Sequence, residues 1–342
     1  MNLEGKIKRW IGRGLLNFCD RFPQTKPLLR NPGLRAKKEW FDGRVVRVQL
    51  PGGKSLKLAS VSENYLSFEL FWRGTQYYEP ITSLVLRELA RPGATFIDVG
   101  ANIGFYSLFL SSCEPQLNVI AFEPNPKNYR LLESNVSVNE LRRIKCEPLA
   151  LSDADGPALL HLSASDMSAS LHADFDFHPT KTVEVKTTTL DSYLARNKML
   201  SPLVIKLDAE GHEESVLKGA QETLDSLHPD IIAEVALNYG SETTALLREA
   251  GYHFYPITDR GLVEADALAP VVRNRFVFLN CLLTARPARE VSALFQRIEP
   301  AVRRIDLTQT SKYLDPLSLQ QFKDRQGASQ PKTQTALADR AG

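Results

Sequence analysis

The sequence predicts an α/β protein built around a mostly parallel sheet. Five short, apolar, β-prone segments alternate with segments that repeat apolar residues at helical spacing. Short crossovers of this kind require parallel strands joined by right-handed connections. We expect strands at residues 95–99, 118–122, 144–150, 203–207 and 230–236, and helices near 104–111, 126–138, 212–226 and 242–250. A terminal pair of strands is expected at 252–257 and 275–279.

The N-terminal part of the chain is strongly basic. Residues 1–47 hold twelve Lys/Arg and four Asp/Glu, a net charge of +8, whereas the whole chain carries +2. Apolar residues recur at helical spacing from Leu3 to Phe22, which predicts a basic amphipathic helix. Such a helix packs on the protein itself or on a partner protein, or lies on an anionic membrane surface. Alternating residues from Val46 to Leu58, around the turn PGGKS, then predict a β-hairpin.

The segment 95–107, TFIDVGANIGFYS, predicts a strand, a glycine turn and a helix. Ligands of such folds bind at the carboxyl ends of the strands. The turn carries Gly100 and Gly104, but a dinucleotide fingerprint needs glycines where Asn102 and Phe105 stand. No Gly-Lys-Ser/Thr follows, so a Walker A loop is excluded too. The turn is therefore not designed to wrap a phosphate.

Two acidic residues favour a cationic cofactor. Asp98, on the strand before the turn, would repel a phosphate and attract a cation; its alternative role is helix capping. Glu123 ends the next strand, where an acid accepts hydrogen bonds from ribose hydroxyls. Glu123 alone does not separate NAD from S-adenosylmethionine, which carries a sulfonium, an ammonium group and no phosphate. Asp98 together with Asn102 favours S-adenosylmethionine.

Four motifs in order resemble the FkbM-type methyltransferases: DVGANIG, AFEPNPKNYRLLESNV, ALSD and IKLDAEGHEESVLKGA. The resemblance spans roughly residues 78–279 and leaves residues 1–50 and 282–342 unexplained. It implies a class I, Rossmann-like methyltransferase fold with a seven-stranded sheet that ends in an antiparallel pair. It also implies S-adenosylmethionine as cofactor, and mostly O-methylation of sugar or polyketide-like hydroxyls. The expected cofactor-binding residues are Asp98, Gly100, Asn102, Gly104, Glu123, Ser152 and Asp153.

Ser152 and Asp153 are included because adenine contacts should follow the third strand, although ordinary turn chemistry explains them equally well.

The turn after residues 203–207 carries the candidate catalytic residues. Asp208 is nearest the strand end and is a candidate base, cofactor contact or metal ligand, with helix capping as its alternative. Glu210 belongs to the D-x-E-G-x-E pattern of the resembled family and could orient a substrate hydroxyl. His212 lies at a helix N-terminus, where the dipole keeps an imidazole neutral as a base.

We expect no metal site. Asp208 and Glu234 lie on adjacent strands and could hold Mg²⁺ with a diol substrate, but Glu234 could pair with Lys206 instead. The His and Asp residues of segment 163–180 match no standard metal spacing, so this segment is expected to be a polar loop and a candidate lid. The four cysteines are far apart and are expected to be free thiols.

The predicted organisation has five parts. They are a basic helix and linker at 1–43, a β-element at 44–80, the methyltransferase domain at 81–285, a C-terminal helix at 286–308 and a disordered tail at 309–342. No apolar run of transmembrane length and no secretory signal is found, so we expect a cytoplasmic protein, with peripheral membrane contact by the basic helix left open.

The expected acceptor is a small hydroxylated molecule or a glycan. A nucleic-acid or lipid-linked acceptor for the same cofactor is the first alternative, although no nucleic-acid-binding module is recognised. An NAD-linked oxidoreductase and a non-catalytic binding scaffold are the others. The sequence assigns no oligomeric state.

Overall fold

The computed structural model describes most of the chain between residues 43 and 307. The described ranges are 43–59, 61–162, 169–171, 181–199, 202–235, 241–269, 271–273 and 276–307, with isolated positions 14, 18, 19, 21 and 41. The expected basic helix, most of the candidate lid and the C-terminal tail lie outside these ranges. None of the helices within them combines the length and hydropathy needed to cross a membrane.

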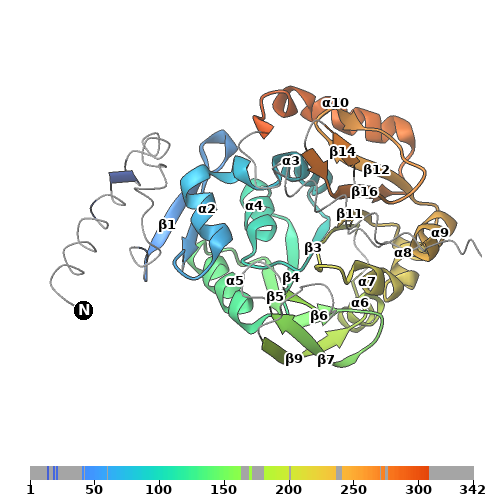
Figure 1. Ribbon diagram of the computed structural model, residues 1–342, viewed down its shortest axis with the longest axis horizontal. Helices are drawn as coiled ribbons and strands as arrows, with labels where there is room; N and C mark the ends of the chain where they lie inside the picture. The colour runs from blue at the N-terminus through green and yellow to red at the C-terminus, as the bar shows by residue number, and fades with distance from the viewer. Residues whose placement is uncertain are drawn as a thin grey trace, which may run out of the picture.

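The centre of the protein is a sheet in the order β13-β12-β16-β11-β10-β3-β4-β5 (Figure 1). Its strands are β3 (Thr95–Val99), β4 (Asn118–Phe122), β5 (Ile144–Glu147), β10 (Leu203–Leu207), β11 (Asp230–Glu234), β12 (His253–Thr258), β13 (Gly261–Leu262) and β16 (Asn280–Thr284). Neighbours from β5 to β11 pair in parallel, and β16 runs antiparallel to both β11 and β12. Apart from the short hairpin strand β13, this is the predicted seven-stranded class I sheet with an antiparallel terminal pair.

The last strand of that pair differs from the prediction. We expected residues 275–279, but the partner of β12 is β16, and β15 (Phe276–Phe278) pairs with β14 (Val271–Arg273) in a separate ribbon. Residues 276–284 form one nearly continuous apolar stretch, FVFLNCLLT, so the pattern does not indicate which half enters the main sheet.

Two other predicted elements are interrupted. The strand expected at 144–150 divides at Pro148 into β5 and β6 (Leu149–Leu151), because proline has no N–H to donate to a ladder. The helix expected at 212–226 divides into α7 (Glu213–Lys218) and α8 (Gln221–Leu227). Gly219 lies between them, and a β-carbon there would be 2.0 Å from the Ser152 carbonyl oxygen. Close backbone approach, which sequence periodicity does not reveal, therefore breaks this helix.

Helices cover both faces of the sheet. Strand β3 shows the alternation, since Phe96 packs into one hydrophobic cluster while Ile97 and Val99 pack into the other. The first cluster includes α3 (Pro80–Leu89), α4 (Phe105–Cys113), α5 (Pro126–Val138) and α10 (Ala288–Val302). The second includes α6 (Leu190–Asn197), α7, α8 and α9 (Ser241–Glu249).

The β-element predicted before residue 80 forms a hairpin with a helix. Strands β1 (Val45–Gln49) and β2 (Ser55–Ala59) pair antiparallel through the turn η4 (Pro51–Gly53), as predicted. Helix α2 (Tyr65–Arg73), which we did not predict, and the short η5 (Thr75–Tyr77) follow. Side chains of α5 fix the hairpin, because the amide oxygens of Asn135 and Asn139 accept hydrogen bonds from the main-chain N–H groups of Ala59 and Lys57.

A second sheet lies beside the main one, in the order β6-β9-β7-β8. Strands β7 (Gly156–Leu162) and β9 (Lys181–Thr188) pair antiparallel, which confirms the predicted pairing of residues 158–162 with 182–188. Strand β8 (Ala169–Ser170) adds to the outer edge of β7. Because β6 directly continues from β5, this sheet is attached at the carboxyl edge of the main sheet, beside the pocket described next.

Candidate functional site

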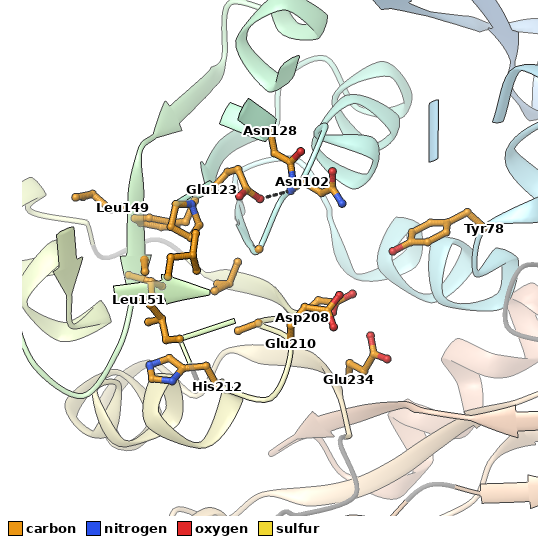
Figure 2. A pocket seen from close by; sticks show the side chains of 18 residues that line it. Tyr78, Asn102, Glu123, Asn128, Leu149, Leu151, Asp208, Glu210, His212 and Glu234 are labelled. Atoms are coloured by element: carbon orange, nitrogen blue, oxygen red, sulfur yellow. Dashed lines mark hydrogen bonds between the residues drawn. The ribbon is translucent and has the colours of Figure 1, made fainter. Parts of the chain in front are cut away.

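A pocket of about 210 Å³ opens at the carboxyl ends of β3, β4, β10 and β11 (Figure 2). This is the edge at which parallel α/β sheets bind ligands. Of the ten predicted site residues, Gly100, Asn102, Glu123, Asp208, Glu210 and His212 line it, whereas Asp98, Gly104, Ser152 and Asp153 do not. The pocket has two chemically different ends, which we call the ribose end, around Glu123, and the carboxylate end, around Asp208 and Glu234.

At the ribose end, main-chain groups hold the Glu123 carboxylate. Its Oε2 accepts a hydrogen bond from the Asn102 N–H at 2.7 Å, and its Oε1 accepts one from the Asn125 N–H at 2.8 Å. Asn102 has a left-handed backbone (φ 52°), and its N–H points at Glu123 from the glycine turn. Burial raises the pKa of Glu123 to about 7. Each carboxylate oxygen keeps further acceptor capacity, so Glu123 can accept a pair of hydroxyls.

Asn128 adds a second polar group at this end. Its side chain lines the pocket beside Glu123 (Figure 2), and its buried Oδ1 has no hydrogen-bond partner among the described residues. A buried amide oxygen without a donor costs free energy unless a ligand or water satisfies it. Sequence analysis did not single out Asn128, because an asparagine in the first turn of a helix has no distinguishing pattern.

Asp98 is buried and does not line the pocket. Its Oδ2 accepts hydrogen bonds from the Ser107 N–H at 3.1 Å and from the Ser107 hydroxyl at 2.6 Å. Burial raises the pKa of Asp98 to about 6. These bonds tie β3 to α4 across the glycine turn, so Asp98 positions the turn in this structure and does not face a ligand in the pocket.

Glycine is needed at positions 100 and 104 for two different structural reasons. Gly100 has φ 75°, and a β-carbon there would lie 1.9 Å from the Asp208 carbonyl oxygen, so it allows the loops after β3 and β10 to touch. Gly104 has φ 83°, and a β-carbon there would lie 2.5 Å from the Leu132 side chain. Gly104 therefore serves packing between α4 and α5, outside the pocket.

The wall next to the ribose end is apolar. Leu149 and Leu151 of β6 line it, with Leu160 from the second sheet. Ser152 and Asp153 directly follow β6 and do not line the pocket, and the Ser152 hydroxyl is 2.9 Å from Nε2 of His212. His212 itself lines the pocket beside Leu151, away from Asp208 and Glu234 (Figure 2). Such a wall is suited to a flat aromatic ring such as adenine.

The carboxylate end gathers acidic side chains from separate strands. Asp208 follows β10 and Glu234 ends β11, and Figure 2 shows both near Glu210 and facing the ring of Tyr78. The ammonium group of Lys206, whose side chain is 1% exposed, lies 3.1 Å from Asp208 Oδ2.

The loop that carries Asp208 and Glu210 is fixed by Glu213. Its Oε1 accepts hydrogen bonds from the N–H groups of Ala209 at 2.8 Å and Gly211 at 3.2 Å. Glu210 has a left-handed backbone (φ 52°), and its carbonyl oxygen accepts a hydrogen bond from the Ser170 hydroxyl. Burial raises the pKa of Glu213 to about 7. Glu213 is thus a structural carboxylate that holds the candidate catalytic loop.

A third carboxylate comes from outside the recognised motifs. This residue is Glu79, at the N-cap of α3. Glu79, Asp208 and Glu234 each contribute one carboxylate oxygen to a group in which every pair lies within 4.8 Å. Oε2 of Glu79 accepts hydrogen bonds from the Tyr106 hydroxyl at 2.7 Å and from Asn280 Nδ2 at 2.8 Å. Nothing in the local sequence around Glu79 predicts this meeting, which depends on how α3 packs against the sheet.

A family model and three relatives that match this chain are methyltransferases. Residues 98–254 match the methyltransferase FkbM domain. Hexuronic acid methyltransferase AglP of Haloferax volcanii is 29% identical over 191 residues, which cover 54% of this chain and 74% of AglP. Methyltransferase 1 of Beauveria bassiana is 26% identical over 182 residues, 47% of this chain and 73% of the relative. The 31-O-demethyl-FK506 methyltransferase FkbM of Streptomyces tacrolimicus is 28% identical over 192 residues, 47% and 74% of the two chains.

Proposed function

We propose that this chain, which belongs to the FkbM methyltransferases, transfers a methyl group from S-adenosylmethionine to a hydroxyl of a sugar, a glycan or another small hydroxylated metabolite. Two relatives are named as methyltransferases of hexuronic acid and of 31-O-demethyl-FK506, which supports acceptors of this class. The observation that carries the proposal is the two-ended pocket, with a carboxylate held by main-chain N–H groups at one end and acidic side chains at the other.

The residues at the ribose end fit this cofactor. Glu123 would accept hydrogen bonds from both ribose hydroxyls, since its carboxylate is already oriented by the Asn102 and Asn125 N–H groups. Asn128 would receive a donor from the ligand at its unsatisfied Oδ1. The wall of Leu149 and Leu151 would pack on the adenine ring. The glycine turn is not suited to a pyrophosphate, because Asn102 occupies the position where a dinucleotide fingerprint has its second glycine.

The carboxylate end would hold the acceptor. When bound, S-adenosylmethionine would supply a methyl group on a positively charged sulfur, which a hydroxyl oxygen attacks as the carbon–sulfur bond breaks, leaving S-adenosylhomocysteine. Asp208 would accept the hydrogen bond of the acceptor hydroxyl and orient its oxygen. The hydroxyl proton would pass to a carboxylate of this end, Asp208 or Glu210. The negative charge here would also stabilise the cationic sulfur before transfer.

His212 is assigned to the cofactor instead of the acceptor. Its imidazole contacts Ser152 and lies beside Leu151, on the far side of the pocket from Glu234. A base must reach the proton that it removes. We therefore propose that His212 borders the adenine-binding region and that Ser152 orients its ring.

Mass spectrometry of acceptor mixtures tests the proposal. Purified protein is incubated with methyl-deuterated S-adenosylmethionine and panels of nucleotide sugars, oligosaccharides and hydroxylated polyketides. We expect one acceptor class to gain a labelled methyl group on oxygen, and the Asp208→Asn variant to leave it unlabelled. Labelled nitrogen or carbon atoms, or an acceptor without hydroxyl groups, would overturn the assignment as an O-methyltransferase.

A further inference from the structure

We propose that Glu79, Asp208 and Glu234 form a binding site for a divalent cation of the Mg²⁺ or Mn²⁺ type at the carboxylate end of the pocket. The sequence led us to expect no metal, because it offered two carboxylates and a lysine as partner. The structure adds Glu79 and turns Lys206 toward Asp208. The proposed cation binding does not depend on the proposed function, whereas a role of the cation in catalysis rests on it.

The spacing of the carboxylates suits a cation. One oxygen from each residue lies within 4.8 Å of the other two. Two oxygens on opposite sides of a cation are separated by about twice the metal–oxygen distance, roughly 4.0–5.2 Å for Mg²⁺ to Ca²⁺. The three oxygens therefore bracket a volume that a cation fills after small rotations of the side chains. An all-oxygen ligand set selects hard cations over zinc or copper.

A buried amide points to the same ligand. Asn280 is 6% exposed, and its Nδ2 donates to Oε2 of Glu79. It pairs directly with Glu234 across β11 and β16, which places both side chains on one face of the sheet. The side chain is thus directed between two members of the cluster, and its buried Oδ1 has no hydrogen-bond partner among the described residues. An amide oxygen is a ligand of Mg²⁺ and Ca²⁺, so a cation would satisfy this atom directly or through water.

The charge around the cluster also favours a cation. Three carboxyl groups meet at a place where Glu79 is 7% exposed. Among the described residues Lys206 contacts Asp208, and the Tyr106 hydroxyl donates to Glu79 without adding charge. Bringing carboxylates together in a poorly solvated site costs free energy unless positive charge lies beside them. A divalent cation would supply positive charge to all three.

The cation would lie where the acceptor binds. Asp208 and Glu234 both line the pocket, and Tyr78 faces them from the opposite side. A bound cation lowers the pKa of an oxygen that coordinates it. The acceptor hydroxyl would therefore lose its proton more easily, and Glu210, beside Asp208, would receive it. Acceptors with two neighbouring hydroxyls would be preferred, because both oxygens can reach one cation.

The experiment titrates Mn²⁺ into the full chain and follows free Mn²⁺ by electron paramagnetic resonance, with neither cofactor nor acceptor present. We expect a single saturable site for the wild type, which excess Mg²⁺ competes away. Glu79→Gln should weaken it at least tenfold, and Glu234→Gln should do the same. The control is Glu147→Gln, which neutralises another partly buried carboxylate, one that pairs with Lys145 and Tyr193 away from the cluster.

Glu79→Gln is designed to fold. A glutamine can place its amide oxygen where Oε2 lies and keep both hydrogen bonds, from Tyr106 and Asn280. Circular dichroism and S-adenosylhomocysteine binding are measured on every variant. If Glu79→Gln is unfolded, the test relies on Glu234→Gln. Absence of saturable Mn²⁺ binding to the wild type, or equal affinity in the folded variants, overturns the cation site. Mn²⁺ binding without any S-adenosylhomocysteine binding would support the cation site and overturn the proposed function.

Discussion

The two ends of the pocket are built in opposite ways. At the ribose end a single carboxylate, Glu123, is held by two main-chain N–H groups from nearby loops. At the carboxylate end Glu79, Asp208 and Glu234 come from three distant segments, with one oxygen of each within 4.8 Å of the others, and Lys206 contacts Asp208. Main-chain N–H groups hold a carboxylate in place regardless of which side chains lie nearby. Carboxylates that meet need positive charge beside them, and we propose that the methyl acceptor reacts at this end.

The comparison also separates binding from turnover. Changes at the ribose end should weaken cofactor binding and leave the rate of methyl transfer unchanged. Changes at the carboxylate end should slow methyl transfer and leave cofactor affinity unchanged.

Asp208→Asn should have the largest effect. The amide keeps the shape of the side chain but carries no charge with which to orient the acceptor hydroxyl, hold a cation or balance Lys206. We expect kcat to fall by about 10²–10⁴-fold, the range for losing a group that assists proton removal. Affinity for S-adenosylhomocysteine should change by no more than a few-fold. Steady-state kinetics with an identified acceptor, together with calorimetry, measure the two quantities. An unchanged kcat would remove Asp208 from the mechanism.

Glu123→Gln should act mainly on the cofactor. Hydrogen bonds to a charged group contribute about 1.5–3 kcal/mol, so we expect S-adenosylhomocysteine to bind about 10–100-fold more weakly. With saturating cofactor, kcat should stay within a few-fold of the wild type. Calorimetry checks the affinity, and Glu147→Gln, a carboxylate outside the pocket lining, is the matched control. Wild-type affinity in the variant would contradict the ribose assignment.

Cofactor affinity should depend on pH through the same residue. Burial raises the pKa of Glu123 to about 7 in the free protein, so below this pH the carboxyl is largely protonated. Hydroxyl donors favour the ionised form, hence binding releases a proton and tightens as pH rises. We expect affinity to increase about tenfold from pH 6 to pH 8.

Two variants locate the titrating group. The increase of cofactor affinity with pH should vanish in Glu123→Gln. It should persist in Glu213→Gln, although burial also raises the pKa of Glu213 to about 7, because Glu213 holds a loop and does not line the pocket. Loss of the pH dependence only in Glu213→Gln would assign the titration to the loop after β10 instead.

His212→Gln should have the smallest effect. The glutamine can keep a hydrogen bond to the Ser152 hydroxyl, and His212 lies at the far side of the pocket from Glu234. We expect a few-fold loss in S-adenosylhomocysteine affinity and a kcat within about threefold of the wild type. A fall in kcat near 10²-fold with unchanged affinity would show that His212, and not the carboxylate end, removes the acceptor proton.

The sequence placed Gly100, Asn102 and Glu123 at one pocket because the determinants of this end are local. The strand–turn–helix of residues 95–107 and the acid that ends the next strand lie within short motifs, and parallel strands bring their carboxyl ends together. The main sheet was predicted for the same reason. Its last strand was misplaced by a few residues because the apolar run at 276–284 holds two candidate strands.

The carboxylate end was only half predicted because it depends on packing. Asp208 and Glu210 follow from a motif, but Glu79 reaches Asp208 and Glu234 only because α3 packs against β11 and β12, with Asn280 holding the carboxylate of its N-cap. The direction of a side chain is equally hidden from sequence. Asp98 and Glu123 both belong to strand ends, yet Asp98 turns toward Ser107 and Glu123 toward the pocket.

The identity of the cofactor is measured by calorimetric titration of the wild-type chain with S-adenosylhomocysteine and, separately, with NAD⁺. We expect a single saturable site for S-adenosylhomocysteine and no binding heat for NAD⁺, because Glu123 fits a ribose while the glycine turn does not fit a pyrophosphate. Saturable binding of NAD⁺ with none of S-adenosylhomocysteine would contradict this expectation.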